Sequence, residues 1–256
     1  MFYLKNIIPL PINKRNVYFP KNIFMKKIKL ISLLAILLVF ITNNAFSQWS
    51  GSGTQSSPYL ISDSADLISL SNYVKSGNTS AGKYFKLTND INLANVSNFV
   101  PIGGWNTSGT STSDYNQFKG NFDGNGKLIK NLYIHRDTTA NSLQERIGLF
   151  GYIGNGAVIK NLGVVNASIR GSLCIGIICG YSNNATVSNC YTSGKVSGWD
   201  ACGGICGLAD YSTIESSYSK ADMNGYNKIG GIAGIIGVTT IKNSFFIGST
   251  KGTTLV

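Results

Sequence analysis

The stretch that decides the fold is GGICGLADYSTIESSYSKADMNG, residues 203–225. A second stretch, GGIAGIIGVTTIKNSFFIGSTKG at residues 230–252, matches it position by position. Each copy begins on paired glycines, continues through a β-branched residue and small polar residues, and ends on another glycine. A sequence that repeats itself at a fixed interval predicts a stack of equivalent structural units.

Weaker copies extend this repeat toward the N-terminus. The glycines that close the Gly-rich boxes follow one another at spacings of 29, 27 and 27 residues, at Gly151, Gly180, Gly207 and Gly234. A second box of one aliphatic, one polar and one Asn or Ser residue follows each of these glycines. It begins at Ile159, Val187, Ile214 and Ile241 and ends at Asn161, Asn189, Ser216 and Asn243, and we place an earlier copy at Ile129 to Asn131.

The local chemistry of the repeat selects one architecture. A period near 27 residues is compatible with leucine-rich repeats, helical arrays or β-solenoids. The spaced leucines of the first class are absent, and paired glycines inside a helix would cost about 1 kcal/mol each. Short β segments between Gly, Asn and Ser turns remain, and they predict an all-β fold, a parallel β-helix with two or three strands per coil.

In such a stack every side chain has its own copy as a neighbour, about 4.8 Å away along the strand-pairing direction. We expect Gly boxes to form corners, by positive φ or by close backbone approach. Lys130, Lys160, Glu215 and Lys242 should face water. The expected ladders are aliphatic (Ile129, Ile159, Val187, Ile214, Ile241), amide (Asn131, Asn161, Asn189, Asn243) and aromatic (Tyr191, Tyr218, Phe245).

These boxes carry a family resemblance. GLFG at 148–151, GGICG at 203–207 and GGIAG at 230–234, each followed by the Ile-x-Asn-like box, resemble GLUG-type repeats, and FKGNFDGNGKLIKNL at 118–132 is similar to the block that introduces them. The pattern departs at Ile177, where glycine is expected, and at Ser216, where asparagine is expected. The resemblance spans about 118–252 and implies a right-handed parallel β-helix of bacterial surface proteins, also found beside the catalytic domains of some immunoglobulin A proteases.

The charge distribution argues against nucleic acid as a partner. The net charge is +11, but seven of the 22 basic residues lie in residues 1–47, which hold no acidic residue, so the remainder carries only +4. Those residues include MKKIK at 25–29 and the apolar run LISLLAILLVFI at 30–41. The run is shorter than the ~20 residues of a membrane span, and Ala45 and Ser47 fit signal-peptidase cleavage before Gln48. We therefore expect a secreted or cell-surface protein whose mature chain has no membrane span.

The sequence divides into four predicted segments. Residues 1–24 are an extended or spurious N-terminus, 25–47 a signal peptide, 48–117 an N-terminal cap with irregular first coils, and 118–256 the repeats, which we expect to be truncated at the C-terminus. In the cap, strands are expected at 58–61, 84–87 and 91–93 and a loop at 106–116. A helix capped by Ser62 or Ser64 should bury Leu67, Leu70, Tyr73 and Val74.

Candidate catalytic and metal-binding residues are few. His135 is the only histidine, on an expected loop, and the sequence has no HExxH motif, so metalloprotease activity is not inferred from the resemblance. Asp200 and Asp210 are the acid pair we weighed for a glycosidase, which requires carboxyls about 5–10 Å apart. Asp123 and Asn125 in DGNG favour a turn over a Ca²⁺ loop.

The five cysteines, Cys174, Cys179, Cys190, Cys202 and Cys206, are expected to be mostly buried free thiols, although Cys179 should stack on Cys206. Directly opposed residues on adjacent strands are too widely spaced for a disulfide. We predict no catalytic residue, no metal and no cofactor. The sequence favours a non-catalytic surface module, adhesin-like or structural, with a glycan or protein ligand. The alternatives are a carbohydrate-active β-helix enzyme and the stalk of a larger surface protease.

Overall fold

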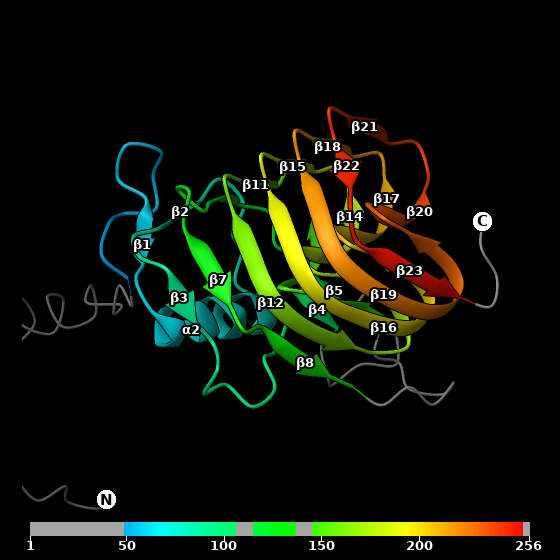
Figure 1. Cartoon of the computed structure of the whole chain (residues 1–256). Coiled ribbons are helices and arrows are strands. Elements are labelled where there is room, and N and C mark those ends of the chain that lie inside the picture. The colour runs from blue at the N-terminus through cyan, green and yellow to red at the C-terminus, as the bar shows by residue number, and fades with distance from the viewer. Residues whose placement is uncertain (1–48, 106–114, 137–144, 253–256) are drawn as a thin grey trace, which may run out of the picture. The chain divides into compact units, whose positions relative to one another are not determined.

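A computed structural model describes residues 49–105, 115–136 and 145–252, which lie in one compact unit, Ser47–Val256 (Figure 1). The predicted leader at 25–47 and the extension at 1–24 lie outside the described residues. The described chain is a parallel β-solenoid with one helix, which confirms the predicted fold class. No helix among the described residues is long and apolar enough to cross a membrane.

Three parallel sheets, here named A, B and C, form the sides of the solenoid. Sheet A contains, in spatial order, β1 (Tyr59–Ile61), β2 (Tyr84–Leu87), β6 (Asn121–Asp123), β11 (Val158–Lys160), β15 (Thr186–Ser188), β18 (Thr213–Glu215) and β21 (Thr240–Lys242). Sheet C contains β10 (Phe150–Gly154), β14 (Cys179–Asn183), β17 (Cys206–Asp210) and β20 (Ala233–Ile236).

Sheet B is the largest side and holds the longest strands, which run next to one another across Figure 1. Its main path is β3 (Ile91–Asn92), β7 (Leu128–Lys130), β12 (Gly163–Arg170), β16 (Tyr191–Gly203), β19 (Tyr218–Gly230) and β22 (Phe245–Phe246). Three further strands pair with this path, namely β8 (Tyr133–His135), β13 (Leu173–Gly176) and β23 (Ser249–Gly252), and β9 (Glu145–Ile147) pairs with β13.

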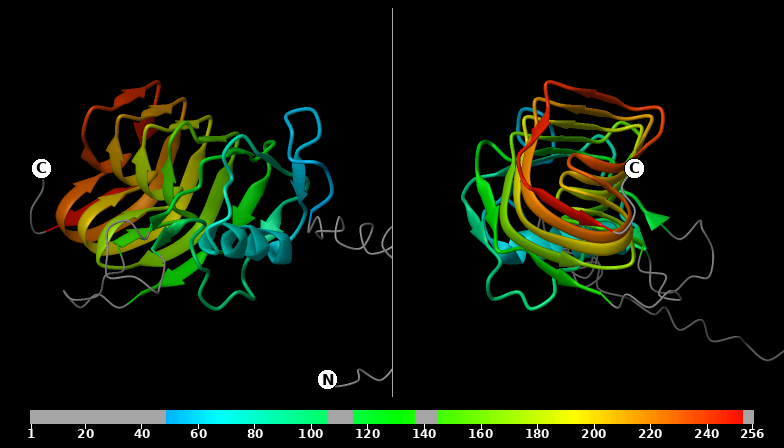
Figure 2. Two further views of the ribbon diagram at one scale, coloured as in Figure 1. Left: turned by 180° about the vertical axis from the view of Figure 1, so that it is seen from behind. Right: turned by 45° about the vertical axis from the view of Figure 1, so that its right-hand side comes forward.

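One coil runs from sheet C through sheet A to sheet B and returns to sheet C at a Gly-rich corner. Strands β14, β15 and β16 make one coil, and β17, β18 and β19 make the next. Figure 2 shows these coils stacked on one another. The stacking follows from the 27-residue repeat, because every strand then pairs with its own copy in the next coil.

The strand register shows which predicted ladder members are neighbours. Ile159 pairs with Val187, Val187 with Ile214, and Ile214 with Ile241. Ile129 is a correction, because it lies in sheet B and pairs with Val164 and Ile91. Phe122 occupies the position next to Ile159 instead. Residues 129–131, Ile-Lys-Asn, resemble the sheet A box because an asparagine follows a short strand in both sheet A and sheet B.

Two separate amide ladders replace the single one that we predicted. In sheet A, Asn189 Nδ2 donates to Asn161 Oδ1 at 2.7 Å, and Asn161 Nδ2 donates to Asp123 Oδ1 at 3.0 Å. In sheet B, Asn131 Nδ2 donates to Asn92 Oδ1 at 2.7 Å, and its own Oδ1 accepts a hydrogen bond from Asn166 Nδ2. Asn161 and Asn189 thus belong to the ladder of sheet A, and Asn131 belongs to that of sheet B. In sheet A, Ser216 and then Asn243 occupy the equivalent positions in the next two coils.

The left-handed position after each sheet A strand is occupied by asparagine or serine, and a second left-handed position, at Arg146, Cys174, Ala201 and Lys228, precedes each Gly box. Asn161, Asn189 and Asn243 have φ of 55°, 51° and 48°, and Ser216 has 48°. Asparagine tolerates this region better than other residues with a Cβ because its side chain bonds locally. Of the two alternatives predicted for the box glycines, positive φ is not found at Gly151, Gly180, Gly207 or Gly234.

The box glycines are needed for close backbone approach instead. A Cβ on Gly180 would lie 2.3 Å from the carbonyl carbon of Arg146, and one on Gly207 would lie 2.4 Å from that of Cys174. At Gly234 the corresponding distance to the carbonyl carbon of Ala201 is 2.5 Å. Each glycine thus packs against the backbone of the preceding coil, where no side chain of any other residue fits.

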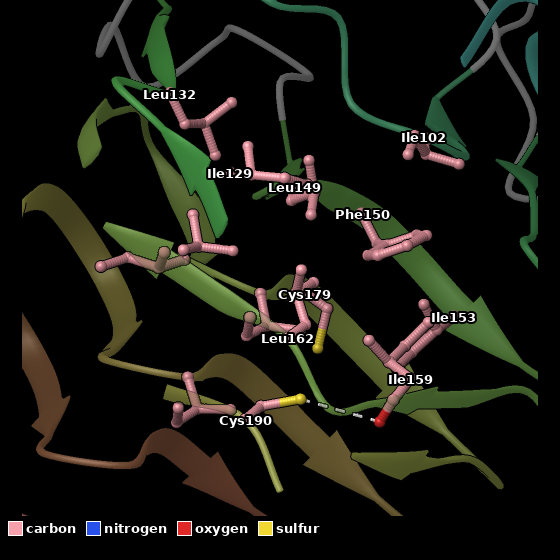
Figure 3. Packing of buried hydrophobic residues seen from close by; sticks show 14 of the residues in the cluster. Ile102, Ile129, Leu132, Leu149, Phe150, Ile153, Ile159, Leu162, Cys179 and Cys190 are labelled. Carbon is pink, nitrogen blue, oxygen red and sulfur yellow. Dashed lines mark hydrogen bonds between the residues drawn. The ribbon is translucent and has the colours of Figure 1, made fainter. Parts of the chain in front are cut away.

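The interior is a continuous apolar core built from all three sheets. Figure 3 shows Leu149, Phe150, Ile153, Ile159 and other members packed together, each with no exposed surface. Inward residues alternate with outward ones along the strands, as a half-buried strand requires. Lys160, Glu215 and Lys242 face water on sheet A, and Lys242 Nζ lies 2.8 Å from Glu215 Oε2.

The helix α2 (Ser64–Lys75) occupies the first coil between strands β1 and β2. Its N-cap is Asp63, whose carboxylate accepts a hydrogen bond from the Asp66 amide at 2.9 Å, so the prediction of Ser62 or Ser64 is wrong. Aspartate accepts this bond at least as well as serine, which explains the choice. Leu67, Leu70 and Val74 are buried and join the core, as does Ser71, whereas Tyr73 is only partly buried.

The C-terminal end of the predicted loop at 106–116 forms a short strand. Residues 106–114 lie outside the described residues, and β5 (Tyr115–Asn116) pairs antiparallel with β4 (Gly104–Trp105). Asn116 Nδ2 donates to the carbonyl of Lys75 at the end of α2 at 2.8 Å. The end of this segment is therefore held against the helix.

Candidate functional site

A β-bulge creates a hollow on the outer face of sheet B. Val164 pairs with Thr192 but Ala167 pairs with Gly194, so β12 holds one residue more than β16 over this interval. Asn166 takes up the extra length with φ of 53°. A Cβ on Gly194 would lie 2.1 Å from the Ala167 carbonyl oxygen, so only glycine fits opposite the bulge. Bulges of this kind redirect side chains and are frequent beside functional sites.

The hollow opens into a groove of about 780 Å³ that spans several coils. Its walls come from the segment at 94–97, from β8 and from the outward residues of β12, β16 and β19. Polar side chains dominate the groove where these strands meet, and the charged ones come from two neighbouring coils. The polar lining includes Asn166, Ser168, Tyr133, Lys195, Lys220 and Asp222.

His135 contacts two residues that line this groove, and the structure places it in β8 instead of the predicted loop. Its Nε2 is 3.1 Å from Ser168 Oγ and its Nδ1 is 2.9 Å from the Tyr133 hydroxyl. Asn98 holds its backbone through two hydrogen bonds. Burial lowers the pKa of His135, and the nearby Arg170 guanidinium lowers it further, so both favour the neutral imidazole.

Two lysines dominate the charge of the groove. Neither Lys195 nor Lys220 belongs to any of the four ion pairs among the described residues. Asp222 pairs in register with Lys195, and its Oδ1 accepts a hydrogen bond from Ser249 at 2.6 Å. The groove therefore carries more positive than negative charge.

Exposed aromatic rings lie on the same sheet. Tyr133 is 39% exposed in the groove, and Trp199 and Tyr226 are 54% and 47% exposed near the end of β16 and β19. The rings of Trp199 and Tyr226 stack at 4.1 Å between centroids. The aromatic ladder predicted at Tyr191, Tyr218 and Phe245 is stacked too, at 5.3 and 5.0 Å. A contiguous exposed patch such as the stacked pair of Trp199 and Tyr226 is typical of an interaction site, whereas a single exposed ring is ordinary.

The carboxylates that we weighed as a glycosidase pair lie on different sheets. Asp200 is in β16 of sheet B and lies 3.3 Å from Lys228 Nζ. Asp210 ends β17 in sheet C, where its Oδ1 accepts hydrogen bonds from the amides of Tyr211 and Val238. Each acid is therefore engaged in its own local structure.

The five cysteines, all within the described residues, form no disulfide. Cys179, Cys190, Cys202 and Cys206 are buried and Cys174 is partly buried, with Cys179 and Cys206 directly paired in register. Burial raises the pKa of Cys190 and of Cys202 to about 12. Thiols that remain protonated are poor nucleophiles and poor metal ligands.

A search of the described residues for metal ligands finds no group of three or more His, Cys, Asp or Glu side chains that could hold an ion. The DGNG segment is a turn in which Asp123 Oδ1 accepts a hydrogen bond from the Asn125 amide at 2.8 Å. This bond and the amide ladder occupy the Asp123 carboxylate.

The groove was missed at the sequence level, although a signal for it existed. The first repeat interval, from Gly151 to Gly180, is 29 residues, two longer than the others. One extra residue lies in the turn after β10, since Ile153 pairs with Ser182 but Val158 with Thr186. The other is the bulge residue in β12. An irregular interval in a regular repeat thus marked the position of the groove.

Comparison with known proteins supports the architecture. No family model matches the chain, so the GLUG-type name stays a prediction. A crystal structure described as a "putative immunoglobulin A1 protease" from Bacteroides ovatus is similar with a TM-score of 0.58 and 25% identity, over 79% of this chain and 69% of that one. The resemblance to repeats of surface proteins is thereby supported for the fold.

Two curated relatives are much longer proteins. Halomucin of Haloquadratum walsbyi is 34% identical over 152 residues, which are 59% of this chain and 2% of the relative. A protein described as "Putative Gly-rich membrane protein" from Evansella cellulosilytica is 33% identical over 150 residues, 54% of this chain and 16% of the relative. The chain therefore matches a small part of each.

Proposed function

We propose that this chain is an exported, non-catalytic surface module that displays an extended binding face in the manner of an adhesin. The observation that carries the proposal is the outer face of sheet B, where a polar groove and exposed rings extend over several coils. A β-solenoid suits this task because each added coil lengthens the same face without a new fold. The description of one relative as a membrane protein is compatible with a place at the cell surface.

Three features favour display over catalysis. The groove is open, the two acids considered for glycan cleavage lie on different sheets, and burial raises the pKa of the Cys190 and Cys202 thiols to about 12. Solvent-open sites gain little from electrostatic stabilisation of a transition state, whereas they suit many weak contacts with a large partner. The ligand is a glycan or a protein on another surface.

Export and display are tested by expressing the full chain in a bacterial host. We expect the mature protein to begin at Gln48 and to be digested by a protease added to intact cells. A variant with two Asp residues in place of Leu33 and Leu34, in the apolar run, should stay inside and remain protected. Detection of unprocessed chain only in the cytosol of the wild-type strain would refute the proposal.

A second candidate function rests on the contact between Ser168 and His135. A serine hydroxyl 3.1 Å from a neutral imidazole is the arrangement that activates a nucleophile for ester hydrolysis. The Ser168 amide, however, donates to the Leu132 carbonyl, so it is not available to an oxyanion. Hydrolysis of p-nitrophenyl acetate that is lost in Ser168→Ala and retained in Ser197→Ala would favour this function over display.

A further inference from the structure

The groove of sheet B has the chemistry of a site for one class of polymer. It runs across neighbouring coils, so its length follows the stack of strands and not a single loop. Its two lysines come from adjacent coils, Lys195 on β16 and Lys220 on β19, at positions two residues apart in the register, and Asp222 of β19 lies beside Lys195. A site of this extent fits a linear ligand better than a compact one.

The lysines determine the charge of that ligand. Lys195 and Lys220 have no carboxylate partner within ion-pair distance among the described residues. By contrast Lys130, Lys160, Lys228 and Lys242, on other parts of the surface, all have one. Lys220 Nζ lies 5.6 Å from the centroid of the Tyr218 ring, and Asp222 is the register partner of Lys195. Two ammonium groups without an ion-pair partner, against one carboxylate, favour a ligand that carries anionic groups.

The uncharged polar groups of the groove favour a ligand that is rich in hydroxyl groups. The amide ladder of sheet B ends at Asn166. Its Nδ2 donates a hydrogen bond to Asn131 Oδ1, whereas its own Oδ1 accepts no hydrogen bond among the described residues. Ser168 Oγ is shared with His135 and retains acceptor capacity. Carbonyl and hydroxyl oxygens of this kind bind sugar hydroxyls, whereas an apolar peptide would leave them without partners.

Tyr133 provides the flat apolar surface on which a sugar ring packs. Its hydroxyl is bonded to His135 Nδ1 at 2.9 Å, and the two rings lie 4.1 Å apart, which fixes its orientation. The ring remains 39% exposed toward the groove. A ring that is held in place before binding loses little conformational entropy when a ligand packs on it.

From these observations we propose that the groove binds a linear acidic polysaccharide whose sugar carboxylates contact Lys195 and Lys220 and whose rings pack on Tyr133. Nucleic acid is the less favoured polyanion, because two lysines cannot follow a phosphate backbone over several nucleotides. The inference rests on the proposed function and specifies its ligand.

The test measures binding by calorimetry with the purified full chain and three acidic polysaccharides, polygalacturonate, alginate and hyaluronate. Dextran is the neutral control and polyphosphate the control for a polyanion without sugar. We expect at least one acidic polysaccharide to bind and both controls to bind much more weakly. The double variant Lys195→Ala with Lys220→Ala should weaken binding by about tenfold or more.

A matched double variant, Lys160→Ala with Lys242→Ala, removes the same charge from sheet A and should change affinity by less than about twofold. Tyr133→Ala should weaken binding, and Tyr133→Phe, which keeps the ring, should largely restore it. The proposal is overturned if none of the three polymers binds, if dextran or polyphosphate binds as tightly, or if the sheet A variant loses as much affinity. Because the assay uses purified protein, it is independent of whether the chain is exported.

Discussion

Replacing Gly207 by alanine would place a methyl group inside the backbone of the neighbouring coil. The added Cβ would lie 2.4 Å from the carbonyl carbon of Cys174 and from the amide nitrogen of Ile175, and 2.6 Å from the carbonyl oxygen of Gly180. All three atoms are backbone, so no side-chain rotation relieves the overlap. Ordinary contact begins at 3.4 Å, and the strands would therefore have to separate by about 1 Å.

The cost of that separation follows from the register. Gly207 is in β17, which pairs on both sides with β14 and β20, and a displacement of the strand weakens both ladders. Overpacking a rigid interior costs about 1–3 kcal/mol, and the absence of any flexible neighbour places Gly207→Ala at the upper end, about 3 kcal/mol. In a domain of this size each kcal/mol lowers Tm by roughly 2–4 °C, so we expect a decrease of about 6–12 °C.

The assay is thermal unfolding followed by circular dichroism, with amide exchange to locate the weakened coils. Gly225→Ala is the matched control, because its Cβ would meet the flexible end of Ile229 at 3.0 Å and backbone no closer than 3.2 Å, at the carbonyl oxygen of Gly198. We expect the control to lower the free energy of unfolding by less than about 1 kcal/mol. A Gly207→Ala protein as stable as the wild type, or no less stable than the control, would refute close backbone approach as the reason for the box glycines.

Three further predictions concern the ladders and the thiols. In urea unfolding, Asn189→Ala should destabilise the fold by about 1–2 kcal/mol more than Asn189→Gly. Both variants lose the amide hydrogen bond, but only alanine is strained at φ of 51°. Equal losses of stability in the two variants would exclude backbone strain. Ile214 is fully buried, so Ile214→Ala should lower the free energy of unfolding by about 2–5 kcal/mol in the same measurement. Ile241 is partly exposed in the edge strand β21, so Ile241→Ala should lower it by clearly less. The reverse order would contradict the ladder. The free energy of unfolding should fall as pH rises from about 9 to about 12, since burial holds the pKa of Cys190 and Cys202 at about 12 while these thiols ionise near 9 once unfolded. In a pH series of chemical denaturation, the double variant with alanine at both cysteines should show a shallower fall, and an unchanged slope would exclude the thiols as its cause.

The sequence by itself determined the solenoid. Equivalent residues at intervals of 27 must have equivalent neighbours, so the pairing of Ile214 with Val187 and Ile241 follows directly from the spacing. The lack of helix-forming stretches and the short β segments between turn residues fixed the type of coil. These are local and periodic properties, which a single chain displays without any knowledge of its tertiary contacts.

Only the tertiary structure decided which sheet each irregular segment joins. Ile129 and Asn131 share the local pattern of the sheet A box but lie in sheet B, because the choice depends on how far the chain has travelled around the coil. The groove has the same origin: its one extra residue in β12 becomes a bulge only through pairing with β16. Tyr133, Ser168, Lys195 and Lys220 come together across coils, and no local pattern relates residues whose proximity is created by the winding of the chain.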